Sequence, residues 1–293
     1  MRGAGKSATL LGLVNGFRIA ALTVALFATL LDARPAAAAP PAQVTARTRY
    51  FAYQDERYLF RDQRDSGAAL LPDVGPAEPV PLIVLLHGVN PGNDTHLWLG
   101  GGGRDLRPLA VALMQSGEVS PFVLAAPSQT KGARSTKRLW SDFDLSSFVD
   151  AVAEASAGSI EIDRQHVVLM GHSGAGCNPG GGLASPFWTE AAPLPQALVS
   201  IDPCLDVEMG AAMARRPGSV PLLLWWQSAI WRRDPLAFWA ALTLDQPDQR
   251  LDRLQELRVA GQNPHDAIVP LAFERTVREL FPVPRVASAD PGA

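Results

Sequence analysis

Residues 167–176 read Val-Val-Leu-Met-Gly-His-Ser-Gly-Ala-Gly, and this stretch decides the fold. Four apolar residues lead directly into a turn of small residues, with Ser173 at its centre. A serine on a sharp strand-to-helix turn projects its hydroxyl above the end of a sheet, if the residues two before and two after it are small. Gly171 and Ala175 occupy those positions, so the stretch predicts an exposed nucleophilic serine, although the pattern prefers glycine at position 175.

Apolar runs of similar length recur on both sides of this stretch and alternate with helical segments. The expected strands are residues 81–86, 122–126, 167–170, 197–201 and 221–226, with a weaker one at 254–260. The expected helices are residues 106–115, 145–157, 235–242 and 267–280. Continuously apolar strands that alternate with helices are typical of a parallel sheet covered by helices on both faces. The expected fold class is therefore α/β, with a mostly parallel, doubly wound sheet in one domain.

The segment before the first of these strands has a different pattern. Residues 49–60 alternate aromatic and polar side chains, which predicts an N-terminal antiparallel hairpin. Residues 68–81, rich in glycine and proline, are expected to form a connecting loop.

The composition supports a single large core, since 47% of the 293 residues are hydrophobic and 19% are charged. These proportions exclude a disordered or fibrous protein. The formal net charge is −3 and like charges form no long run, so we expect no nucleic-acid partner. The chain has no dinucleotide fingerprint, zinc-ligand spacing or heme motif, and we therefore expect no cofactor and no metal.

The first 38 residues have the pattern of an export signal. Basic residues come first, then the uncharged run 19–31, then the alanines 36–39. Thirteen residues rise about 20 Å as a helix, less than the roughly 30 Å of a bilayer core, so no stable membrane span is expected after cleavage. We expect residues 1–38 to be a signal peptide, with an uncleaved membrane anchor as the alternative. Residues 39–293 are then the mature domain, located in the periplasm or secreted.

A His-Gly pair follows the strand expected at residues 81–86. A loop at this place commonly supplies one backbone N–H to an oxyanion hole, and the residue after the nucleophile supplies the other. The second donor is then the N–H of Gly174. For the first donor we favour Val89, with Asn90 as the alternative.

One of the five histidines has the right place for a general base. His265 lies in an expected loop after the last strand and before the final helix, at the sheet edge where Ser173 is expected. His166 precedes its strand and belongs to the opposite edge. His172 adjoins the serine, and we expect its side chain to point elsewhere.

With a His-Gly loop, a Gly-x-Ser turn and a late histidine in this order, the chain resembles the α/β-hydrolase family over nearly all of its mature length. Ser173, His265, Val89 and Gly174 match the family pattern position by position. Together with the export signal, the resemblance implies an exported serine hydrolase that cleaves a small or medium carboxylic ester through an acyl-enzyme intermediate. A peptidase, amidase, lactonase or lipase of the same fold is the alternative, as is a non-catalytic binding member.

The resemblance also implies an acid between serine and histidine, usually just after the strand at residues 221–226. The nearest carboxylate there, Asp234, is eight residues beyond the strand. Asp202 follows the preceding strand by one residue and is our first choice, because a residue anchored at a strand end is easier to hold in place. Asp206 and Asp266 remain as further alternatives.

The two cysteines lie close to these candidate residues in the sequence. Cys177 follows the serine by four residues and Cys204 follows Asp202 by two, at the ends of strands expected to be neighbours. In an exported protein such a pair is expected to form a disulfide, with two buried thiols as the alternative. A proline and three glycines within residues 177–182 interrupt the helix that should follow the serine. The glycine-rich residues 100–103 form either a lid or a plain surface loop.

Overall fold

The computed structural model describes residues 44–53, 66–75, 78–92, 99–100, 103–129, 134–188, 194–229, 234–244 and 252–283. The expected signal peptide, residues 1–38, lies outside this part of the chain, and so do residues 54–60 of the expected hairpin. None of the helices in the described part is long and apolar enough to cross a membrane.

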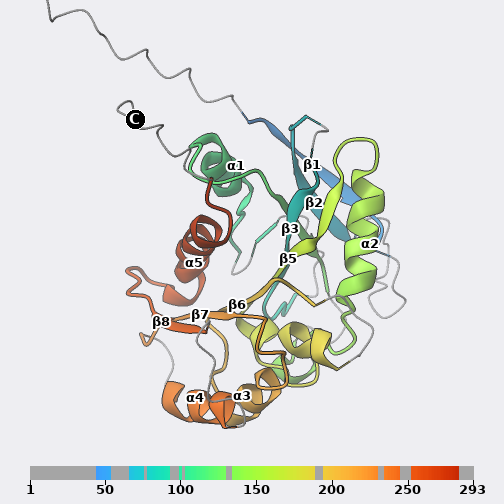
Figure 1. The fold of residues 1–293 in the computed structure, drawn as a ribbon. Coiled ribbons are helices and arrows are strands. Elements are labelled where there is room, and N and C mark those ends of the chain that lie inside the picture. Colours follow the sequence, from blue (N-terminus) through green and yellow to red (C-terminus); the bar gives the residue numbers. More distant parts are fainter. Residues whose placement is uncertain are drawn as a thin grey trace, which may run out of the picture. The chain divides into compact units, whose positions relative to one another are not determined.

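One sheet of eight strands organises the described residues, in the order β1-β2-β4-β3-β5-β6-β7-β8 (Figure 1). The strands are β1 (Ala46–Phe51), β2 (Gly67–Pro72), β3 (Val80–Leu86), β4 (Val123–Pro127), β5 (Ile162–His172), β6 (Ala197–Ile201), β7 (Leu222–Trp226) and β8 (Arg253–Glu256). Strand β2 pairs antiparallel with β1 and β4, and the other neighbours pair in parallel. The expected mostly parallel sheet with an N-terminal antiparallel hairpin is confirmed.

The second strand of that hairpin is not where the sequence placed it. Strand β2 occupies Gly67–Pro72, inside the segment expected to be a connecting loop. All six of its residues are buried, because β1 and β4 flank it and both faces of the sheet are covered. A short strand buried on both faces shows no apolar-polar alternation, so its glycine and proline dominated the sequence pattern.

Five α-helices pack against this sheet within the described residues: α1 (Arg107–Gln115), α2 (Leu145–Ser156), α3 (Val207–Met213), α4 (Pro235–Thr243) and α5 (Pro264–Leu280). The short helix α3 was not expected from the sequence. Helix α5 begins three residues earlier than expected, because Asn263 caps its first turn and Pro264 suits its first position. His265 therefore lies in the first turn of a helix, and its expected position in a loop was wrong.

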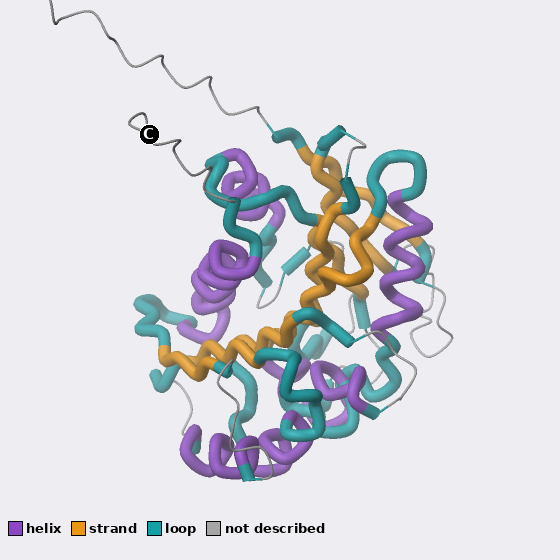
Figure 2. The backbone as a smooth tube through the Cα atoms, viewed as in Figure 1, coloured by secondary structure: helices purple, strands orange, loops and turns teal. Residues whose placement is uncertain are grey.

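The inner strands are buried on both faces, and their side chains alternate between two cores, whereas the edge strands β1 and β8 are partly exposed. On β3, Leu82 and Val84 belong to the core under α2, α3 and α4, whereas Ile83 and Leu85 belong to the core under α1 and α5. Figure 2 shows the sheet running between these helices, with α1 and α5 on one side and α2 on the other. The doubly wound arrangement explains why these strands are continuously apolar in the sequence.

The parallel strands bring the candidate residues to one edge of the sheet. In the pairing of β5 with β6, His172 lies opposite Ile201. The next residue of each strand, Ser173 and Asp202, therefore leaves the sheet at the same level. His87 follows β3, the neighbour of β5 on its other side.

Candidate active site

Ser173 stands on a sharp turn directly after β5. Its φ angle is 54°, in the left-handed region that residues other than glycine seldom adopt. A Cβ atom on Gly171 would lie 3.0 Å from the Cβ of Ala175 and 2.9 Å from the Cγ of Leu183. Alanine is accommodated at position 175 because position 171 is glycine, so the departure from the usual pattern leaves the turn intact.

His265 and Asp202 form a close pair at the same edge. The Nδ1 of His265 lies 2.5 Å from Oδ2 of Asp202, whose side chain is fully buried. A carboxylate accepts hydrogen bonds, so Nδ1 carries the proton that is donated. In the neutral imidazole, Nε2 then carries the free lone pair. This Nδ1–H tautomer is the one that a general base requires.

Gln227, a residue that the sequence analysis did not consider, holds the Asp202 carboxylate from the other side. Its Nε2 donates to Oδ2 at 2.9 Å and its backbone N–H points to Oδ1 at 3.3 Å. Gln227 directly follows β7, the place where the family resemblance put the acid. An amide therefore stands there, and the carboxylate that contacts the histidine comes from the neighbouring strand.

The other candidate acids have different partners. Asp234 accepts from a backbone N–H in the first turn of α4, at 2.9 Å, and Asp206 does the same for α3, at 2.8 Å. Asp266 accepts from the side chain of Asn263 at 2.5 Å, and burial raises the pKa of its carboxyl. Asp234 and Asp206 thus act as helix caps.

The backbone after β3 packs against the serine turn. A Cβ on Gly88 would lie 2.8 Å from the Cβ of Ser173, and a Cβ on Gly174 would lie 3.4 Å from the backbone nitrogen of Val89. The structure thus brings together the two residues that were expected to supply oxyanion donors. Asn90 is buried, and its side chain points to the carbonyl oxygen of Gln129 at 3.4 Å.

Comparison with known proteins finds similarity to solved structures alone. No protein-family model and no curated protein sequence matches the chain. The structure is similar to that of an uncharacterised protein from Capnocytophaga ochracea, with a TM-score of 0.50 and 13% identity over 83% of this chain and 66% of that one. This chain thus spans just under two thirds of that protein.

Two esterases are similar at slightly lower TM-scores. A thermostable esterase has 18% identity and a TM-score of 0.49, over 82% of this chain and 62% of that one. Thermogutta terrifontis esterase 2 has 15% identity and a TM-score of 0.46, over 82% of this chain and 92% of that one. The sheet topology, with the serine turn after β5 and the paired histidine after β8, decides the assignment. The chain has the α/β-hydrolase fold.

The histidine beside the serine contacts the paired histidine, His265. His172 is 2% exposed, and its Nε2 donates to the backbone oxygen of His265 at 3.1 Å. The expectation that His172 points elsewhere was wrong. Its neighbours Val168 and Met170 face the core under α5, and strand periodicity of two directs His172 to the same face.

A disulfide joins Cys177 to Cys204, with their Cα atoms 5.1 Å apart. The expected pairing is therefore present, and it links the turn of Ser173 to the turn of Asp202. Two 3₁₀ turns, Ser173–Gly176 and Gly182–Phe187, replace the long helix after the serine. The interruption expected at residues 177–182 is confirmed.

Within the described residues, one group of side chains is close enough to share a metal ion: His172, His265 and Asp266, whose ligand atoms lie within 4.8 Å of one another. Hydrogen bonds already use Nε2 of His172 and Nδ1 of His265.

Of the glycine-rich segment expected to be a lid or a surface loop, Gly101 and Gly102 lie outside the described residues.

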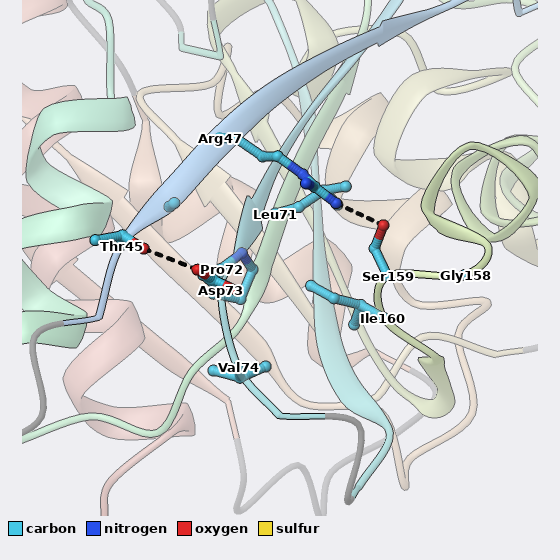
Figure 3. A pocket seen from close by; sticks show the side chains of 10 residues that line it. Thr45, Arg47, Leu71, Pro72, Asp73, Val74, Gly158, Ser159 and Ile160 are labelled. Atoms are coloured by element: carbon cyan, nitrogen blue, oxygen red, sulfur yellow. Dashed lines mark hydrogen bonds between the residues drawn. The ribbon is translucent and has the colours of Figure 1, made fainter.

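A pocket of about 230 Å³ lies at the opposite edge of the sheet, before the start of β5 (Figure 3). Arg47 donates to Ser159 at its rim at 2.5 Å, and Thr45 donates to Asp73 at 3.2 Å. Strand β3 runs beside β5 from Ile162 to Gly171 over seven residues, Val80–Leu86, which span roughly 23 Å. The pocket is therefore remote from Ser173.

Proposed function

We propose that the protein is an exported serine hydrolase that cleaves carboxylic esters through an acyl-enzyme intermediate. The hydrogen bond between His265 and Asp202, at the sheet edge where Ser173 stands on its turn, carries the proposal. A serine, a histidine in the Nδ1–H tautomer and a buried acid are the groups that acyl transfer requires.

Acylation begins when the Oγ of Ser173 attacks the carbonyl carbon of the ester. The Oγ proton passes to Nε2 of His265, a bond forms between Oγ and carbon, and the carbonyl oxygen becomes an oxyanion. The N–H groups of Val89 and Gly174 stabilise this charge. When the oxyanion collapses, the carbon–oxygen bond to the alcohol breaks, and the alcohol leaves with the proton from His265.

Deacylation repeats these steps with water as the nucleophile. Water gives a proton to His265 and its oxygen bonds to the acyl carbon. The bond from carbon to Ser173 then breaks, and the serine regains its proton from the imidazolium. The sum is one ester and one water converted to one acid and one alcohol.

The positive charge that forms on His265 requires compensation. The first turn of a helix disfavours a cation, by about 0.3–1 kcal/mol at exposed sites. The Asp202 carboxylate contacts the ring directly and is shielded from water, where its attraction for the imidazolium is strengthened. Asp202 therefore orients the imidazole and stabilises its charged form, with Gln227 holding the carboxylate in place.

Two features support the export part of the proposal. The first is the signal pattern in residues 1–38. The second is the disulfide between Cys177 and Cys204, because such bonds persist in oxidising compartments.

A substrate series tests the proposed activity. Nitrophenyl esters of increasing acyl length are assayed beside a peptide and a lactone. We expect turnover of the esters, reduced at least about 10³-fold in Ser173→Ala. Ser159→Ala is a matched control at the opposite edge of the sheet and should retain full activity. Turnover of the peptide or lactone alone would reassign the substrate class. Equal ester turnover by Ser173→Ala and Ser159→Ala would contradict the mechanism.

A further inference from the structure

His87, the last residue before the proposed oxyanion loop, is held through both ring nitrogens. It is 5% exposed and follows β3. The backbone N–H of Gln129 donates to its Nε2 at 2.9 Å. Nε2 is therefore an acceptor, and the proton of the neutral ring lies on Nδ1. Nδ1 donates it to the carbonyl oxygen of Gly88 at 2.7 Å.

The bond to Gly88 determines the direction of the Val89 N–H. Both groups belong to the same peptide unit, and the described residues contain no cis peptide bond. In a trans peptide the C=O and the N–H point in opposite directions. With the oxygen anchored by His87, the N–H is directed to the other side, and the Val89 nitrogen is the one that lies beside Gly174.

A closed circuit of backbone and side-chain hydrogen bonds through three buried residues, His87, Trp140 and Gln129, keeps the His87 ring in this position. The indole Nε1 of Trp140 donates to the backbone oxygen of His87 at 2.9 Å, and the two rings meet edge to face at 4.8 Å. The backbone N–H of Trp140 donates to the side chain of Gln129 at 2.6 Å. If the His87 ring rotated, the buried backbone N–H of Gln129 would lose its hydrogen-bond acceptor, which is unfavourable.

We infer that His87 is a positioning residue that fixes the Val89 N–H in the orientation required of an oxyanion donor. The catalytic consequence rests on the proposed function, whereas the structural claim does not. His87 needs no contact with substrate in this role. A donor held in place before the reaction requires no reorganisation as charge develops on the substrate oxygen.

Two substitutions separate positioning from packing. In His87→Asn the side-chain amide nitrogen can take the place of Nδ1 and still donate to Gly88. In His87→Leu both bonds are lost. If the leucine variant does not fold, His87→Gln replaces it, because its amide oxygen can accept from Gln129 while the donor to Gly88 is missing. His166→Leu, at an exposed histidine of the opposite edge, is the matched control.

Crystal structures and ester kinetics of these variants give two readouts. In His87→Leu we expect the Gly88–Val89 peptide to rotate and kcat to fall about 100-fold, with little change in KM. In His87→Asn we expect the wild-type peptide orientation and kcat within about 10-fold of wild type. His166→Leu should leave both readouts unchanged.

Two results would overturn the inference. One is a Gly88–Val89 peptide in its wild-type orientation in a folded His87→Leu or His87→Gln variant, whatever the activity. The other is an equal loss of kcat in all His87 variants that follows their melting temperatures, because this marks a packing role. If the wild-type protein hydrolyses no ester, the proposed function fails, and the peptide orientation still decides the role of His87.

Discussion

His172 and His265 lie against each other, with their ring centroids 4.5 Å apart. The Nε2 of His172 also donates to the backbone oxygen of His265 at 3.1 Å. His172 is covalently joined to Ser173. Its side chain therefore links the serine turn to both the ring and the backbone oxygen of His265. Any shift of the first turn of α5 relative to the serine turn would disturb these contacts.

Replacing His172 should therefore disturb catalysis more than stability. We expect His172→Leu to lower kcat about 10- to 100-fold, because it loses the hydrogen bond to the His265 backbone and the base is displaced. His172→Gln retains a side-chain N–H near the place of Nε2 and should lose less. Steady-state kinetics with a nitrophenyl ester measures both. Wild-type kcat in His172→Leu would show that the contact has no catalytic part.

Asp202 should be the carboxylate on which turnover depends. Asp202→Asn removes the charge that holds the imidazole tautomer, and we expect kcat to fall at least about 100-fold in a protein that remains folded. Asp234→Asn is the matched control, because asparagine caps a helix about as well as aspartate. A larger loss in Asp234→Asn than in Asp202→Asn would transfer the role to Asp234.

Gln227 should affect both stability and rate through Asp202. Gln227→Leu leaves the buried carboxylate without the donor at 2.9 Å, and we expect unfolding free energy to fall by about 1–3 kcal/mol, together with kcat. Gln227→Glu places a second carboxylate beside that of Asp202. Its loss of unfolding free energy relative to wild type should be greatest when both carboxylates are ionised, and should shrink as the pH falls. Chemical denaturation at several pH values measures this. A loss of unfolding free energy in Gln227→Glu that does not change with pH would contradict the contact between residue 227 and Asp202.

The disulfide should support both the fold and the active-site geometry. A closed loop of 27 residues contributes about 3–4 kcal/mol in the chain-entropy estimate. We expect Cys177→Ser to lower the melting temperature by several degrees, and kcat to fall even where the protein stays folded, because the bond links the turns of Ser173 and Asp202. Calorimetry and kinetics at a low temperature separate the two effects. Free thiols in a non-reduced digest of freshly exported protein would refute the premise.

The parts of the site that depend on local sequence were predictable. Strand β3 and the turn of Ser173 each follow from an apolar run and its flanking small residues. The contact between Asp202 and His265 was favoured but left open, because strand order alone does not say which neighbouring carboxylate reaches the ring. The places of His172 and Gln227 depend on the first turn of α5 lying at the end of β5 and on β7 lying beside β6. Strand β2 was missed because, in a strand buried on both faces, neighbouring strands decide the structure more than local pattern does.

Covalent labelling tests the central claim, that Ser173 is an activated nucleophile. The folded protein is treated with a fluorophosphonate, and the adduct is located by peptide mass spectrometry. We expect one adduct per chain, on Ser173, with labelling abolished in Ser173→Ala and strongly slowed in His265→Ala, because the serine hydroxyl is a weak nucleophile without its base. Folded protein that remains unlabelled, or an adduct on a different residue that persists in Ser173→Ala, would contradict the account.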